Sequence, residues 1–126
     1  MRGDFAAYIN EKRKGRGKNG GDVLQKEIAA AMGVSPVYVT DILAGRRNPP
    51  DITLLEKMAE ACSLTPEERE EMLDIAGWER QEAAADLPEY IMDEDIPHVR
   101  VALRRANDKK LGDDFWKKVV DSISKE

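Results

Sequence analysis

A compact run of hydroxyl, amide and guanidinium side chains lies between residues 35 and 48. Ser35, Tyr38 and Thr40 carry hydroxyl groups, and Arg46 and Arg47 follow as two adjacent cations. Hydroxyl and guanidinium groups bind base edges and phosphates. The run therefore favours recognition of a polar, anionic partner.

Other chemistry has little support in the sequence. His98 is the only histidine and Cys62 the only cysteine, so neither a zinc site nor a Cys/His nucleophile can be assembled. The carboxylates of residues 67–71 have the pattern of a helix start with a solvated face, and no glycine-rich loop follows a strand. We therefore expect no enzyme activity, no cofactor and no metal.

Two short helices joined by a tight turn must position this run. Ile28, Ala29 and Met32 give the first helix an apolar face, and Gly33 can adopt the positive φ that ends it. Ser35 and Pro36 are typical of the start of a second helix, predicted over 36–44. Such a pair is a helix-turn-helix, whose second helix fits the major groove of DNA.

The pattern resembles the lambda-repressor-like (Cro/C1, XRE) family of DNA-binding domains over residues 5–76. The segment 53–61, TLLEKMAEA, is similar to the fourth helix of that family. The residues of the central motif are Gly33, Val34, Ser35, Val39, Thr40, Ile42, Gly45, Arg46, Arg47, Asn48 and Pro49.

The resemblance implies a set of residues that contact double-stranded DNA. Val37 can touch a thymine methyl group and Asp41 can accept from cytosine N4, while Gln25 and Lys26 bind the backbone. The full predicted set is Arg16, Lys18, Gln25, Lys26, Ser35, Pro36, Val37, Tyr38, Thr40, Asp41, Arg46, Arg47 and Asn48.

The second helix departs from the usual pattern because it contains no Arg, Gln or Asn. The common bidentate ligands of guanine and adenine are thus absent, and Asp41 is unfavourable near phosphates unless it finds a donor. Shape readout and contacts from Arg46, Arg47 and the basic loop at 12–21 gain importance.

Charge is distributed unevenly along the 126 residues. The net charge is −5, but residues 1–50 hold nine basic and five acidic residues, net +4, whereas residues 51–126 hold eleven and twenty, net −9. The basic excess therefore coincides with the helix-turn-helix. With no apolar run long enough for a signal peptide or membrane span, we expect a cytoplasmic protein.

Residues before the motif predict a helix and a loop. Asp4 is a candidate cap for a helix over 5–14, and the segment 12–21 cannot be a stable helix because it contains four glycines. Its five cations favour phosphate contacts or an arm into a groove, and a solvated insertion without a role is the alternative. Asp22 and Gln25 have capping-box spacing, which predicts that the next helix begins near residue 23.

Helices are also expected over 52–62, capped by Asp51, and over 66–76, capped by Thr65, and Gly77 ends the five-helix unit. The apolar stripe of the former makes Cys62 a buried small hydrophobe. The fold class predicted is all-α, with a five-helix lambda-repressor-like domain at 1–77.

The remainder consists of a linker or irregular wrap at 78–95 and a two-helix appendage at 96–126. The apolar stretch 87–92 should pack on its own domain or on a second subunit. A lone hairpin cannot bury Phe115, Trp116 and the aliphatic residues after them, so the appendage dimerises or packs within the chain.

Together these features predict a sequence-specific, repressor-like transcriptional regulator that binds DNA, most simply as a homodimer on a partly symmetric operator. The alternative is an antitoxin or adaptor whose C-terminal helices bind a partner protein.

Overall fold

The computed structural model describes residues 3–126 and divides them into two compact units, one running through Pro88 and one comprising Glu89–Glu126. Both are helical, and no strand occurs in the described part of the chain, as expected for an all-α fold. None of the described helices is long and apolar enough to cross a membrane.

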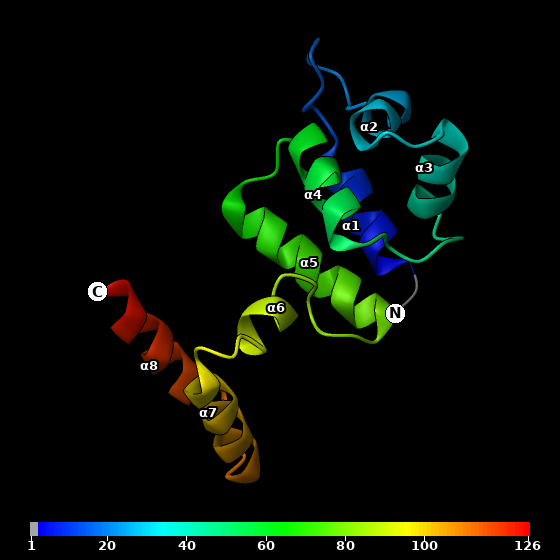
Figure 1. Cartoon of the computed structure of the whole chain (residues 1–126). Helices are drawn as coiled ribbons and strands as arrows, with labels where there is room; N and C mark the ends of the chain where they lie inside the picture. Colours follow the sequence, from blue (N-terminus) through cyan, green and yellow to red (C-terminus); the bar gives the residue numbers. More distant parts are fainter. Residues whose placement is uncertain (1–2) are drawn as a thin grey trace. The chain divides into compact units, whose positions relative to one another are not determined.

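The first unit contains α1 to α5 (Figure 1). Their bounds are α1 Asp4–Lys12, α2 Gln25–Met32, α3 Pro36–Leu43, α4 Ile52–Ala61 and α5 Pro66–Arg80. Helix α2 packs against α3 and α4, while α1 packs against α3 and α5. The five predicted helices of this unit are therefore present, around a common core.

Side chains from all five helices fill this core. Phe5, Ile9, Ile28, Leu55 and Met58 are each at most 1% exposed. Cys62 is also buried, as predicted, and burial raises the pKa of its thiol to about 11. The thiol therefore stays protonated at neutral pH and packs as a small apolar group.

Two predicted caps in the N-terminal region are wrong. Asp4 lies in the first turn of α1, and the N-H groups of Gly3 and Phe5 donate instead to Oε1 of Glu79 on α5, at 2.9 and 3.1 Å. Helix α2 begins at Gln25, where Oε1 of Glu27 accepts from the Leu24 N-H at 3.0 Å. Asp22 accepts from the Gly15 N-H at 3.2 Å, so it stabilises the loop.

The predicted end of the fifth helix near residue 76 is also wrong, because α5 continues to Arg80. Gln81 terminates it with φ 60°, and the Glu82 N-H donates to the Gly77 carbonyl at 2.9 Å. A Cβ at Gly77 would lie 2.9 Å from the Glu82 carbonyl oxygen and 3.0 Å from the Ala84 nitrogen. The glycine therefore lets the chain fold back against α5, where Ala84 joins the core.

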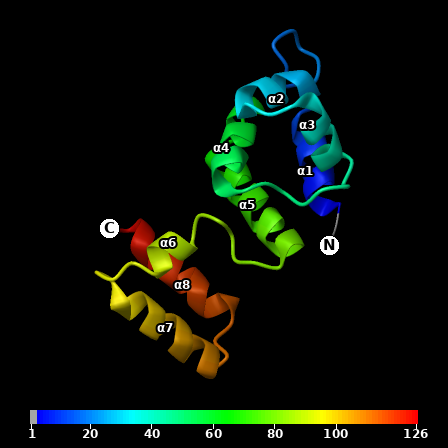
Figure 2. The same ribbon diagram turned by 45° about the vertical axis from the view of Figure 1, so that its right-hand side comes forward.

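The second unit contains the end of the short helix α6 Pro88–Ile91, then α7 Pro97–Asp108 and α8 Asp113–Ser124. Helices α7 and α8 run in opposite directions as a hairpin (Figure 2). Among residues 89–126 only Ala106 is buried, while Val120 and Ile123 are 59% and 66% exposed. Leu87, Tyr90 and Met92, which we expected to pack, are also exposed.

Candidate nucleic-acid interface

The turn between α2 and α3 fixes where α3 begins. Gly33 adopts φ 71°, and the Val34 N-H donates to the Ala29 carbonyl at 3.1 Å, which closes the end of α2. The Ser35 hydroxyl accepts from the Tyr38 N-H at 3.1 Å, and Pro36 occupies the first helical position, where no donor is needed. The sequence-predicted start of the second helix is confirmed.

Helix α3 has a buried face and an exposed face. Val39, Ile42 and Leu43 point into the core, and Nδ2 of Asn10 on α1 donates to the Leu43 carbonyl at 2.9 Å. Of the predicted DNA-binding residues on this helix and its cap, Ser35, Pro36, Val37 and Thr40 are exposed, and Tyr38 and Asp41 are partly exposed. The first face holds α3 in place, so the second is free for a partner.

A hydrogen bond connects the exposed face of α3 to α2. The Thr40 hydroxyl donates to Oε1 of Gln25 at 2.8 Å. Because the carboxamide oxygen is the accepting atom, the Gln25 NH2 group can donate to a further acceptor. Lys26, the next residue, is exposed beside it.

Asp41 and Arg46 form an ion pair at the end of α3. Nε and Nη2 of Arg46 donate to Oδ1 of Asp41 at 3.1 and 2.9 Å. The Arg46 side chain is 62% exposed, and an ion pair so open to water contributes at most about 1 kcal/mol. Asp41 thus has an intrachain donor, and a phosphate can compete for Arg46 at small cost.

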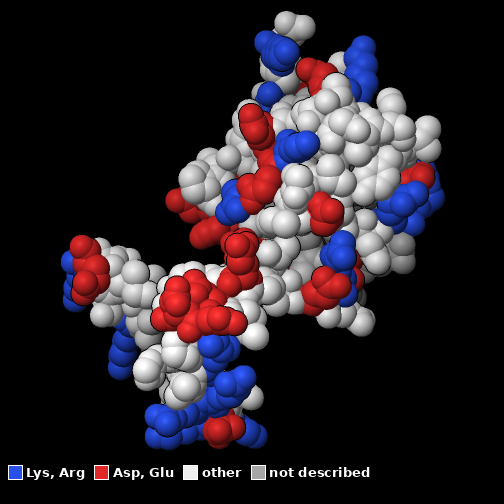
Figure 3. All heavy atoms as spheres, in the orientation of Figure 1, with Lys and Arg blue, Asp and Glu red and all other residues white. Residues whose placement is uncertain are grey.

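Arg47 lies against the ring of Tyr38, with its guanidinium carbon 4.9 Å from the ring centroid. This cation–π contact holds the Arg47 guanidinium group beside Tyr38 of α3. In Figure 3, blue and red atoms adjoin over α3 and the loop that follows it.

An open hollow of about 670 Å³ lies between α3 and the start of α4. Tyr38, Asp41, Arg46, Arg47 and Asn48 line one part of it, and Arg80 from α5 lines another. Nη1 of Arg80 donates to the Pro49 carbonyl at 2.7 Å, which ties the loop after α3 to α5. The hollow combines three guanidinium groups with hydrogen-bonding side chains.

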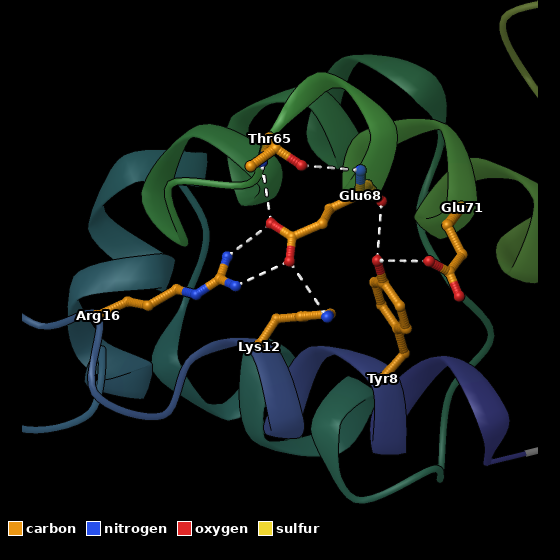
Figure 4. Close-up of polar contacts among 6 residues, drawn as sticks. All are labelled: Tyr8, Lys12, Arg16, Thr65, Glu68 and Glu71. Carbon is orange, nitrogen blue, oxygen red and sulfur yellow. Dashed lines mark hydrogen bonds and ion pairs between the residues drawn. The ribbon is translucent and has the colours of Figure 1, made fainter.

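Arg16 lies apart from this group, in a cluster around Glu68 on α5 (Figure 4). Nη1 and Nη2 of Arg16 each donate to one Glu68 oxygen at 2.8 Å, and Nζ of Lys12 lies 3.1 Å from Oε2. The bonds from Arg16, followed by the Thr65 N-H, hold the pKa of Glu68 well below its usual range. Lys18, further along the loop, is exposed.

Tyr8 borders the same cluster. Its hydroxyl donates to the Glu68 carbonyl oxygen at 3.0 Å and lies 3.5 Å from Oε2 of Glu71. Burial, and then the negative charge of Glu71, raise the pKa of Tyr8 to about 12. Tyr8 therefore stays neutral and connects α1 to α5.

Sequence reasoning missed the residues that support the interface from a distance. Asn10, Glu68 and Arg80 bind backbone or side-chain groups 31 to 52 residues away, and no local spacing indicates those partners. The Asp41–Arg46 pair was detectable as opposite charges five residues apart. Among residues 3–126, no three His, Cys, Asp or Glu side chains are grouped to hold a metal ion.

Comparison with known proteins identifies the same segment. A family model described as a helix-turn-helix domain matches residues 13–72, from the loop before α2 into α5. No curated protein and no solved structure matches the chain. Residues 13–72 of this chain are therefore a helix-turn-helix domain, consistent with the lambda-repressor-like resemblance of the sequence.

Proposed function

We propose that this protein is a sequence-specific transcriptional regulator of the repressor type, which inserts α3 into the major groove of DNA. The observation that carries the proposal is the two-sided placement of α3. One face is anchored by Val39, Ile42 and Asn10, and the other presents Val37, 69% exposed, together with the Thr40–Gln25 pair. A helix held in this way suits the groove.

Each exposed group has a counterpart on DNA. The Val37 side chain matches a thymine methyl group, and the Gln25 NH2 group and Lys26 match phosphate oxygens on one side of the groove. Arg46, Arg47 and Asn48 match phosphates on the other side. Asp41 supplies either an acceptor for cytosine N4 or a counterion for Arg46, and the choice between these two contributes to sequence preference.

We further propose that the protein acts as a homodimer in the cytoplasm. The support is the hairpin of α7 and α8, whose groove of about 360 Å³ is lined by Leu111, Phe115, Trp116 and Val119 along with residues of α7. Two recognition helices joined this way would meet half-sites about 34–36 Å apart on a symmetric operator.

The same hairpin supports a second candidate, an antitoxin or adaptor that binds a partner protein. Its exposed Val120 and Ile123 fit a heterologous partner as well as a second copy. In that case the helix-turn-helix would serve autoregulation or only scaffolding. Neither candidate includes a catalytic step or a cofactor.

The test is selection of duplexes from a randomised pool by the full chain, repeated with Asp41→Asn. We expect the wild type to enrich a defined sequence and the variant to enrich a different one, with changes of about 1–3 kcal/mol at single base pairs. Asp74→Asn is the matched control, since it makes the same change in charge at an exposed position on another helix, α5.

Two outcomes would contradict the proposal. The first is a wild type that enriches no sequence. The second is an Asp41→Asn variant that retains the wild-type preference while binding to a co-purified protein is lost, which favours the adaptor.

A further inference from the structure

The loop between α1 and α2 has a defined hairpin shape. At its neck the Val23 N-H donates to the Arg13 carbonyl at 2.9 Å, and Nε of Arg13 donates to the Val23 carbonyl at 2.8 Å. Nearer the tip, the Gly17 N-H donates to the Gly21 carbonyl at 2.7 Å. These bonds make the loop an ordered projection just before α2.

Gly17 is required for this shape. A Cβ at that position would lie 2.5 Å from the Asp22 carbonyl oxygen and 2.8 Å from that of Gly21, so any other residue would push the two sides apart. At the base of the loop, the bidentate Arg16–Glu68 pair fixes it to α5 (Figure 4). A solvated insertion without a role would not need these contacts. The anchoring therefore favours a loop that has a function.

The anchored loop leaves two lysines together. Lys18 at the tip and Lys26 on α2 line one hollow of about 440 Å³, along with Asn19 and Gly21. Within residues 3–126 neither lysine side chain forms a hydrogen bond or ion pair, and both residues are exposed. In Figure 3, blue atoms lie around this loop with red atoms among them.

Two carboxylates also line the hollow, and each accepts one hydrogen bond within the fold. Asp22 accepts from the Gly15 N-H, and Glu27 accepts from the Leu24 N-H. These bonds hold the two carboxylates in position and leave their charges unchanged, whereas the two ammonium groups keep all their donors for an external anion.

We propose that Lys18 and Lys26 form a phosphate clamp that binds the DNA backbone beside the groove occupied by α3. The hollow adjoins the interface because Lys26 follows Gln25 on α2, and the Gln25 carboxamide is bound to Thr40. No aromatic or guanidinium group lines it, so it can neither stack a base nor grip a base edge in bidentate fashion. The clamp therefore adds affinity without sequence preference.

This inference rests on the proposed DNA-binding function. The salt dependence of binding tests the phosphate clamp separately from that function. The full chain is titrated with its selected duplex and with a random duplex at several salt concentrations. For Lys18→Ala and Lys26→Ala we expect the slope of log K against log[salt] to flatten by up to about 0.9 each, equally on both duplexes. The selected sequence should stay that of the wild type.

Lys14→Ala is the matched control, because Lys14 is an exposed loop lysine that pairs with Glu11 and does not line the hollow. Its slope should equal that of the wild type. Gly17→Ala retains every charge and should weaken binding to both duplexes because it opens the loop, while the thermal unfolding of the domain stays cooperative.

Three results would overturn the clamp. They are unchanged slopes for both lysine variants while the wild type binds DNA, an equal loss for Lys14→Ala, or a change in the selected sequence. A wild type that binds neither duplex even at low salt would overturn the proposed function and the clamp together.

Discussion

The two units of the chain use the same kind of amphipathic helix with different results. In the first unit, five helices enclose side chains such as Phe5, Ile9 and Met58, which are almost wholly inaccessible to water. In the second, α7 and α8 have clear apolar faces, yet none of their large apolar side chains is buried. An apolar stripe predicts a helix, but only further layers of structure bury it.

The largest expected effect comes from removing the second unit. If it dimerises, a chain ending at Pro88 should remain folded and monomeric, and should bind a symmetric duplex about 10²–10⁴-fold more weakly, because the second recognition helix no longer arrives with the first. Sedimentation equilibrium and anisotropy titration measure the two quantities.

A full-length chain that is monomeric across micromolar concentrations would show that the hairpin does not self-associate. A truncated chain that unfolds would contradict the comparison of the two units, since the folding of the first unit would then depend on the second.

A pair of truncated side chains sharpens the comparison. Leu55→Ala in α4, at a position 1% exposed, should lower the free energy of unfolding by about 2–5 kcal/mol. Ile123→Ala in α8, at 66% exposure, should leave the unfolding of α1 to α5 unchanged within about 0.5 kcal/mol. Urea denaturation followed by circular dichroism measures both, and similar losses would mean that α8 belongs to the same core.

Glu79 tests whether the first unit depends on contacts far apart in sequence. Glu79→Ala removes the acceptor for the Gly3 and Phe5 N-H groups, and should cost about 0.5–2 kcal/mol, as for a lost helix cap. Glu70→Ala, at an exposed position on the same helix, is the control. Equal effects of the two substitutions would argue against capping by Glu79.

The smallest effect is the pH dependence that Glu68 contributes. Because its pKa is lowered in the folded state, its stabilisation is complete above the ordinary value of 4.5 and is lost as the pH falls below it. The stability difference between wild type and Glu68→Gln should therefore shrink from pH 6 to pH 3. A difference independent of pH, or the same trend in Glu67→Gln, would contradict this.

Local residues made most helix starts predictable from the sequence. The caps of α3, α4 and α5 are Ser35, Asp51 and Thr65, and each accepts from an N-H three residues later, so the signal lies within one turn. The starts of α1 and α2 escaped the same reasoning. The cap of α1 comes from Glu79, over 70 residues away, and Asp22 found a closer donor in the loop.

The candidate interface divides in the same way. The 3.6-residue period separates buried Val39 and Ile42 from exposed Val37 and Thr40, so the two faces of α3 follow from the sequence. The partner of Arg16 does not. Glu68 is 52 residues from Arg16, whereas Asp41 and Arg46 are five residues apart, where opposite charges can be recognised locally. The DNA contacts themselves stay predictions.

The neck formed by Arg13 and Val23 also lets the loop between α1 and α2 change in length and sequence. Since the two ends of the loop are paired to each other and not to its tip, its length can vary without moving α1 or α2. Doubling a flexible loop costs only about 0.6 kcal/mol in closure entropy. The tip at residues 18–20, beyond the Arg16–Glu68 pair and the Gly17–Gly21 hydrogen bond, is thus a natural grafting site, where a designer or an evolving lineage can exchange one peptide for another while the scaffold stays intact.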